Sequence, residues 1–354
     1  MIDKLPDLVI GDLRINPPII QGGMGVRISK HKLVSAVSNT GALGVISSVG
    51  LGHEADSEVD YEKSSAGALR EEIKKAKALT KNPIGVNIMV ALTNYDSLVK
   101  VCIETGADVI ISGAGLPLKL PQLIVGSKIK ILPIVSSDRA ANIVCTTWKK
   151  KYNKLPDGII VEGPLAGGHL GFSRAELETD ISLEQIVPAV IDVARKFGSA
   201  IPVIAAGGIY DGKDIAKFLR LGAAGVQMAT RFVCTYECDA SLAYKESYLK
   251  AKKEDIIIIN SPVGLPGRVI KNSFVEKILN GEKIKFRCPY KCLRTCDATA
   301  VNYCIADALV NGSKGDMEHG FAMCGQNAYR IDTIVSVSQL VSELVEEAKE
   351  ELSK

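Results

Sequence analysis

The chain has 354 residues, of which 47% are hydrophobic and 23% are charged, and its formal net charge is +3. This length fits one large α/β barrel with an appendage, or two ordinary domains, and the composition is that of a globular protein with a sizeable core. Acidic and basic residues are interspersed, so nothing indicates nucleic acid or a membrane surface as a partner. No run of about 18 uncharged apolar residues predicts a membrane span.

The start of the chain and its cysteines are used to predict the cellular compartment of the protein. The first seven residues, Met-Ile-Asp-Lys-Leu-Pro-Asp, contain acids and a proline and do not resemble a secretory signal peptide. We therefore expect a cytoplasmic protein. In that compartment its nine cysteines are expected to be thiols or metal ligands rather than disulfides.

Eight short apolar runs, rich in Val, Ile and Ala, alternate with helical patterns through the first two thirds of the chain. Nearly continuous runs of this kind are typical of parallel strands that are buried on both faces. They lie at Ile19–Gly23, Leu43–Ser47, Ile84–Val90, Val109–Gly113, Ile129–Ser136, Gly158–Glu162, Pro202–Ala206 and Gly225–Ala229. Helical spacing recurs between them, for example over Leu33–Val37, a helix that we expect Gly41 to end.

The alternation of strands and helices predicts the fold class. It implies right-handed parallel crossovers, and eight such units match a closed (β/α)₈ TIM barrel better than an open sheet. After about residue 232 the pattern changes to a helix over Ala240–Glu254, an irregular stretch, a cysteine-rich segment and a charged helix from Ser336. We therefore predict an α/β protein with a barrel over residues 1–235 and a cysteine-containing helical and irregular extension over 236–354 that packs on it.

Glycines follow several of the predicted strands, at the carboxyl-terminal face where barrels bind ligands. The loops after the seventh and eighth strands, Ala205–Ile209 and Gln227–Arg231, correspond to the usual phosphate site of this fold. Converging backbone N–H groups, a helix start and the hydroxyl of Thr230 can bind an anion there without a lysine. The alternative is that these small residues only end strands for packing.

Five motifs occur in an order that resembles nitronate monooxygenases, formerly called 2-nitropropane dioxygenases. The same order is found in their relatives, the flavin-type enoyl-acyl-carrier-protein reductases. The motifs are Gln21–Gly25, Gly85–Met89, Gly167–Gly171, Ala205–Ile209 and Gln227–Phe232. The similarity covers roughly residues 15–275, with a weaker echo at Gly315–Arg330.

This resemblance implies FMN as the cofactor. The residues that it implies for the flavin ring system are Gly22, Gly23, Met24, Asn87, Glu162 and Gly167. Those that it implies for the phosphate are Gly207, Gly208, Gln227, Met228, Ala229 and Thr230. His169 corresponds to the histidine regarded as the catalytic base or substrate ligand.

The residues themselves also favour His169 among the four histidines. It follows paired glycines after a predicted strand, and imidazole suits both proton transfer near pH 7 and donation to an oxyanion. His31 is expected on a helix surface and His53 in a polar loop, so neither is assigned a role.

The motifs separate the two activities poorly. Glu162 lies where the monooxygenases carry Gln, and Leu170 where they often carry Arg. Glu162 and the Gly85–Met89 motif lean towards the reductases. The segment between Arg268 and Asn311 does not look like a typical reductase ending. We favour a nitronate monooxygenase that oxidises alkyl nitronates with O₂. The alternatives are an NADH-dependent enoyl-acyl-carrier-protein reductase and, from another class, a barrel that binds a phosphate ligand without redox chemistry. The expected partner is a small-molecule substrate, and a homo-oligomer is left open.

Four cysteines, Cys288, Cys292, Cys296 and Cys304, fall within seventeen residues. The first three are spaced four apart, so on a continuous helix beginning near Pro289 they would form one packing stripe. The alternative is a zinc or iron–sulfur site, although the spacing matches neither the usual zinc pairs nor the ferredoxin run. Both interpretations stay open.

Overall fold

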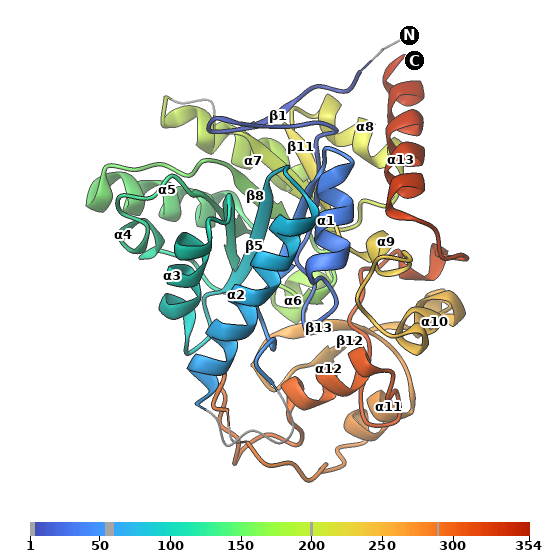
Figure 1. Cartoon of the computed structure of the whole chain (residues 1–354). Helices are drawn as coiled ribbons and strands as arrows, with labels where there is room; N and C mark the ends of the chain where they lie inside the picture. The colour runs from blue at the N-terminus through green and yellow to red at the C-terminus, as the bar shows by residue number, and fades with distance from the viewer. Residues whose placement is uncertain (1–3, 54–59, 199–200, 289) are drawn as a thin grey trace.

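The computed structural model describes residues 4–53, 60–198, 201–288 and 290–354. Its centre is a closed barrel of eight parallel strands, in the order β10-β11-β3-β4-β5-β6-β7-β8 (Figure 1). These strands are β3 (Ile19–Gln21), β4 (Leu43–Ser47), β5 (Ile84–Met89), β6 (Val109–Gly113), β7 (Lys130–Val135), β8 (Ile159–Glu162), β10 (Val203–Ala206) and β11 (Gly225–Met228). All eight predicted runs are barrel strands, so the predicted TIM barrel is confirmed.

Helices surround the barrel and join its strands. They are α1 (His31–Asn39), α2 (Tyr61–Leu79), α3 (Tyr95–Thr105), α4 (Leu120–Leu123), α5 (Asp138–Tyr152), α6 (Arg174–Leu177), α7 (Leu183–Lys196) and α8 (Gly212–Arg220). Local sequence sets their ends: Ser137 Oγ accepts the N–H of Ala140 at the start of α5, 3.2 Å away. The predicted end of α1 is confirmed, because Gly41 takes a φ of +89° just beyond it.

The barrel interior is a dry apolar core, closed at one end by a hairpin of β1 (Leu8–Ile10) and β2 (Leu13–Ile15). Leu8, Ile10 and Ile15 of this hairpin are buried with inward-facing strand residues such as Leu132 and Ile204. The hairpin lies at the end of the molecule opposite α12 (Figure 1). The hairpin therefore covers this end of the barrel, and the opposite end is the barrel mouth.

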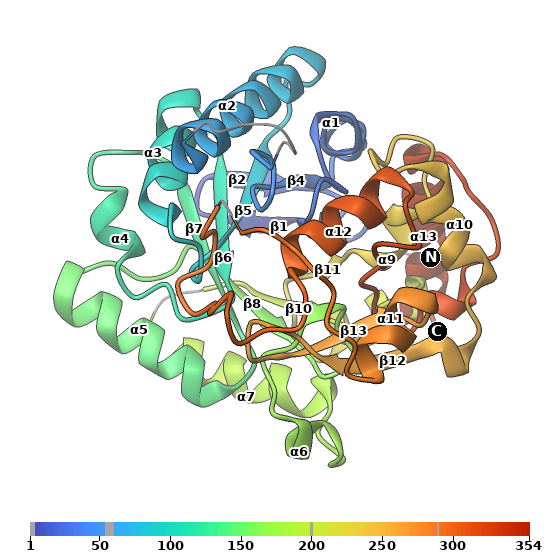
Figure 2. The same cartoon turned by 90° about the horizontal axis from the view of Figure 1, so that it is seen from below.

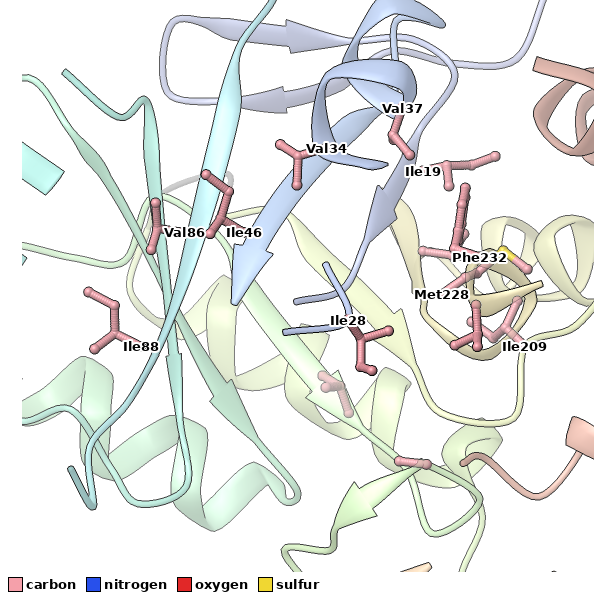
Figure 3. Close-up of a cluster of buried hydrophobic side chains, with 14 of the residues drawn as sticks. Ile19, Ile28, Val34, Val37, Ile46, Val86, Ile88, Ile209, Met228 and Phe232 are labelled. Carbon is pink, nitrogen blue, oxygen red and sulfur yellow. The ribbon is translucent and has the colours of Figure 1, made fainter. Parts of the chain in front are cut away.

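A second and larger core fills the space between strands and helices. Figure 3 shows Val34 and Val37 of α1 packed near Ile19 of β3, with Ile46 of β4 beside them. These side chains are fully buried, which explains why the runs that carry them read as nearly continuous apolar sequence.

The remaining elements cover the mouth and one side of the barrel (Figures 1 and 2). They are α9 (Thr230–Val233), α10 (Leu242–Lys250), η1 (Lys253–Asp255), β12 (Ile256–Asn260), β13 (Pro266–Ile270), α11 (Ser273–Leu279), α12 (Ile305–Lys314), η2 (Ala328–Arg330) and α13 (Val337–Leu352). The segment predicted as irregular contains the β12–β13 hairpin, and β13 pairs antiparallel with the short strand β9 (Gly168–His169). The three-stranded sheet β12-β13-β9 thus contains strands from both sides of residue 235. The division of the chain at residue 235 stays a prediction.

Of the two interpretations left open for the cysteine segment, the packing stripe on a continuous helix is wrong. Apart from Pro289, which lies outside the described residues, the segment from Cys288 to Cys304 consists of turns, bends and irregular chain, and α12 begins only after Cys304. The described helices include none with the length and hydropathy needed to span a membrane.

Candidate active site at the barrel mouth

A cavity of about 280 Å³ opens at the carboxyl ends of the barrel strands, and we call it the mouth cavity. It brings together every residue that the resemblance implied for the flavin or for catalysis. These residues are Gly22, Gly23, Met24, Asn87, Glu162, Gly167, His169, Gly207, Gly208, Gln227, Met228, Ala229 and Thr230. The sequence-based site is therefore one physical place, built from loops that follow different strands.

Geometry favours glycine at three of these positions. A Cβ on Gly23 would lie 2.5 Å from the Cβ of Asn87, so the β3 loop can pass the Asn87 side chain only without one. Gly207 and Gly208 take φ values of +94° and +89°, a conformation that other residues rarely adopt. Glycines in this conformation let the loop backbone approach a ligand closely.

The segment near residue 325, where the weaker sequence similarity lies, is hydrogen-bonded to the two loops predicted to bind phosphate. The Nδ2 of Asn327 donates to the carbonyl of Gly208 at 2.7 Å, and the N–H of Gly325 donates to Thr230 Oγ1 at 3.0 Å. A Cβ on Gly167 would meet the backbone of Cys324 and Gly325 at 2.6 Å. This late segment therefore fixes loops that come from three different barrel strands.

His169 is held from the extension rather than from the barrel. Its Nε2 lies 2.7 Å from Ser261 Oγ, and its backbone pairs with Gly267 of β13. Arg268, which is 3% exposed, donates to the carbonyls of Ala166 and Pro164 and so fixes the loop before His169. Burial lowers the pKa of His169 to about 4, so the imidazole is neutral at pH 7.

Glu162 ends β8 on the wall of the mouth cavity. Its Oε1 accepts the N–H of Gly171 at 3.3 Å. Burial raises the pKa of Glu162 to about 7, against the opposing effects of the Gly171 hydrogen bond and the charge of Arg268. A carboxyl group whose pKa is shifted towards 7 at a cavity wall is a feature of functional sites.

His53 is a functional candidate that the sequence interpretation missed. It was expected in a polar loop without a role, but it is 3% exposed and lines the mouth cavity. Neither ring nitrogen has a hydrogen-bond partner in the described part of the chain. Burial, followed by the charge of Arg27, lowers the pKa of His53 to about 4. Two neutral histidines therefore line one cavity.

Of the four clustered cysteines, Cys292 lines the mouth cavity. Burial raises the pKa of Cys292 to about 12, and the nearby Cys304, Cys288 and Cys296 add to the shift. Among the described residues, no three His, Cys, Asp or Glu side chains are arranged to hold a metal ion. As placed, the four thiols neighbour one another, and a metal there stays a prediction.

The raised pKa of Glu162 predicts a pH-dependent change in stability. Between about pH 4.5 and 7 the folded state holds the Glu162 proton more tightly than the unfolded chain, so this group makes wild-type stability fall as pH rises. Glu162→Gln removes that contribution. The unfolding free energy of the variant relative to wild type should therefore increase from pH 5 to 7 and level off above pH 7, in urea titrations of the ligand-free protein.

The two histidines with lowered pKa values have the opposite trend, but they are present in both proteins and cancel in the difference. Glu178→Gln, at an exposed carboxylate of the same chain segment, controls for the loss of a carboxyl group as such. A flat difference between Glu162→Gln and wild type over this pH range would contradict the assigned shift.

Comparisons with known proteins agree with this geometry. The family model for nitronate monooxygenase matches residues 7–97 and 90–347. A probable nitronate monooxygenase of Staphylococcus haemolyticus is 28% identical over 95% of both chains. In Mycobacterium tuberculosis, a (3aS,4S,5R,7aS)-5-hydroxy-7a-methyl-1-oxo-octahydro-1H-indene-4-carboxyl-CoA dehydrogenase is 30% identical over 77% of this chain and 68% of its own.

Among solved structures, FabK from Thermotoga maritima superposes with a TM-score of 0.75 at 33% identity, over 95% of this chain and 94% of that chain. The family match spans nearly the whole barrel and extension, including both glycine loops and His169. The resemblance seen in the sequence is thereby confirmed: the chain belongs to the nitronate monooxygenase family and is an oxidoreductase.

Proposed function

We propose that this protein is an FMN-dependent monooxygenase of small alkyl nitronates. The observation that carries the proposal is the mouth cavity, which gathers the glycine loops, Asn87 and His169 in a chain of this family. The reaction takes two nitronate anions and one O₂ to two carbonyl compounds and two nitrite ions. When bound, FMN supplies the one-electron oxidation that no side chain of the cavity can perform.

The cavity fits a flavin in its polar groups as well as in its loops. Gln227 and Ser47 are among its lining residues, and Gln227 Oε1 and Ser47 Oγ are buried with no partner among the described residues. Buried polar atoms of this kind are costly unless a ligand completes their hydrogen bonds. Gly207 and Gly208 would hold the phosphate with backbone N–H groups, and Thr230 would add its hydroxyl.

His169 is placed to act on the substrate. It is neutral at pH 7, so it can take a proton from a neutral nitroalkane or donate a hydrogen bond to a nitronate. Burial penalises the imidazolium that proton transfer creates. The nitronate formed beside it offsets that penalty, because opposite charges attract strongly in a cavity with little water.

Reduction of an enoyl thioester is the second candidate. It is favoured by the 33% identity to FabK and by Glu162, which lies where monooxygenases carry glutamine. In that chemistry His169 would donate to the thioester carbonyl as negative charge develops. Anaerobic stopped-flow mixing with NADH and with a nitronate separates the two candidates, because only the true reductant bleaches the flavin.

The first expected outcome concerns the cofactor. Heat-denatured wild-type protein should release FMN, detected by chromatography, because the two phosphate loops form one compact pocket and the sequence has no dinucleotide fingerprint. Gly208→Asp should lose the flavin, since it places a carboxylate where the phosphate would bind.

The matched control is Gly106→Asp at the end of α3, where the glycine also has a positive φ, +71°, but no atom within 4 Å of an added Cβ. This variant bears similar backbone strain and should retain the flavin. Release of FAD from wild type, or a colourless protein after growth with ample riboflavin, would refute the FMN assignment.

For the cysteine segment we propose a structural role rather than electron exchange with the flavin. Cys292 accepts the N–H of Thr93 through its carbonyl at 3.1 Å, so the segment is bound to the barrel by backbone. Cys296→Ser should leave flavin reduction unchanged. Iron or zinc near stoichiometric level in anaerobically purified protein would instead establish the metal site, and loss of flavin reduction in a folded variant that binds FMN would exclude the structural role.

The last expected outcome tests His169 as a base. His169→Asn should lower turnover of a neutral nitroalkane by about 10²–10⁴, the usual contribution of a positioned base. It should affect a preformed nitronate much less, because that substrate has already lost its proton. Flavin content should stay near wild type, since other loops would hold the phosphate.

Steady-state rates with each substrate, at matched flavin content, give the comparison. Because the pKa of His169 is about 4, the wild-type rate should show no limb from this residue between pH 6 and 8. Equal losses with both substrates would leave His169 as an orienting group and remove the base.

A further inference from the structure

The β12–β13 hairpin places a serine hydroxyl against the ring of the candidate catalytic histidine. His169 pairs with Gly267 of β13. The next N–H along the chain, that of Leu170, donates to the carbonyl of Pro266 at 2.9 Å. This pairing brings Ser261, in the connection between β12 and β13, to the imidazole, where its Oγ lies 2.7 Å from Nε2. The contact is therefore set by backbone pairing on the histidine side.

Ser261 is held in place from its own side as well. It is 6% exposed, and its N–H donates to the carbonyl of Leu265 at 3.1 Å. Its carbonyl accepts the N–H of Gly264 at 2.9 Å. Because the backbone on both sides of the contact is hydrogen-bonded, the hydroxyl and the ring have little freedom to separate.

The two edges of the His169 ring have different surroundings. Cδ2, the neighbour of Nε2 in the ring, lies 3.8 Å from the position of a Cβ on Gly267, so this edge packs on the hairpin. The other nitrogen, Nδ1, makes no hydrogen bond within the described chain, yet it is not one of the enclosed side-chain atoms that lack a partner there. Both ring nitrogens of His53, by contrast, are enclosed. Nδ1 of His169 therefore keeps surface that a molecule in the mouth cavity can reach.

We propose that Ser261 is a positioning residue, which binds Nε2 of His169 and leaves Nδ1 as the nitrogen that acts on the substrate. In neutral imidazole one nitrogen carries the proton and the other a lone pair, and the partner of one nitrogen sets the state of the other. A base must turn its lone pair to the substrate, so the proton lies on Nε2 and is donated to Ser261 Oγ. This tautomer rests on the proposed function of His169 as a base, whereas the contact with Nε2 does not.

Ser261 also favours the charged state of the ring. In the reaction, Nδ1 takes the proton from the carbon that bears the nitro group, the C–H bond breaks, and its electron pair stays on the substrate as the nitronate. The imidazolium that results still donates Nε2–H to Ser261 Oγ, and a charged donor makes the stronger hydrogen bond. The hydroxyl therefore stabilises the cation more than the neutral ring, at a place where burial penalises the cation.

The first test is nitrogen NMR of the full-length protein with its flavin, labelled with ¹⁵N-histidine. The chain has four histidines, so the signals of His169 are identified by their loss in His169→Asn. Couplings to the ring protons tell the two nitrogens apart. Wild type should show a protonated Nε2 and an unprotonated Nδ1. Ser261→Ala removes the acceptor and should shift the Nε2 signal and populate the other tautomer.

The second test is steady-state turnover at matched flavin content. Ser261→Ala should lower kcat with a neutral nitroalkane about tenfold, as expected for one lost hydrogen bond, with little change in KM and a smaller effect on a preformed nitronate. Ser261→Thr keeps the hydroxyl and should restore most of the rate. Added to His169→Asn, Ser261→Ala should cause no further loss, because residues that act as a unit are not additive. Ser273→Ala, at an exposed serine that begins α11, is the matched control and should behave as wild type.

Thermal melts establish that the variants are folded. A proton on Nδ1 in wild type would overturn the proposal, and so would a His169 spectrum that Ser261→Ala leaves unchanged. A rate loss from Ser261→Ala that is equal with and without the histidine would also overturn it, because the serine would then act through the fold alone. If wild type oxidises neither a nitroalkane nor a nitronate, the proposed function fails, and the spectra by themselves support or overturn the role of Ser261.

Discussion

The buried guanidinium of Arg268 joins the two parts of the chain on which the site depends. It donates to the carbonyls of Ala166 and Pro164, in the loop between β8 and β9, while its own backbone belongs to β13. A buried charge is tolerated only where hydrogen bonds compensate its lost hydration, so hairpin and loop are held in one arrangement. His169 follows that loop directly and is bonded to Ser261 of the same hairpin connection. The candidate catalytic group is therefore positioned by the extension, and the barrel alone would leave it unsupported.

The charge state of the mouth cavity follows from the same burial. His169 and His53 have lowered pKa values of about 4, and the pKa of Glu162 is raised to about 7. Near neutral pH the cavity thus offers uncharged hydrogen-bonding groups and one carboxyl that is close to half ionised. Charge enters mainly with the ligand, and it meets an environment with little water to screen it. Such a cavity does not bind an ion strongly through a fixed charge of opposite sign. It favours a reaction in which charge is redistributed on the bound molecule.

The sequence predicted the barrel well because its strands are buried on both faces, as in β4 and β6, where predicted and observed bounds coincide. The site followed from topology, since loops after parallel strands share one face. Other features depend on distant partners that local pattern does not reveal. The isoleucine run at Ile256 becomes a strand by pairing with β13, and His53 packs against the rings of Tyr61 and Tyr290. The regular spacing of the cysteines allowed a helix, but the carbonyls of Lys291 and Cys292 instead accept hydrogen bonds from Thr93.

That attachment has a consequence for how the protein acquires its shape. Thr93 bonds the backbone of Lys291 and Cys292, partners 198 and 199 residues further along the chain. Contacts between such distant residues form late, because closing a long loop costs entropy before the contact repays it. The barrel strands can pair with strands that are their neighbours in sequence. The segments that cover the barrel mouth belong to the last third of the chain. During synthesis the half-built barrel would expose an uncovered mouth, and a cofactor captured at that stage would be enclosed by the segments that arrive afterwards.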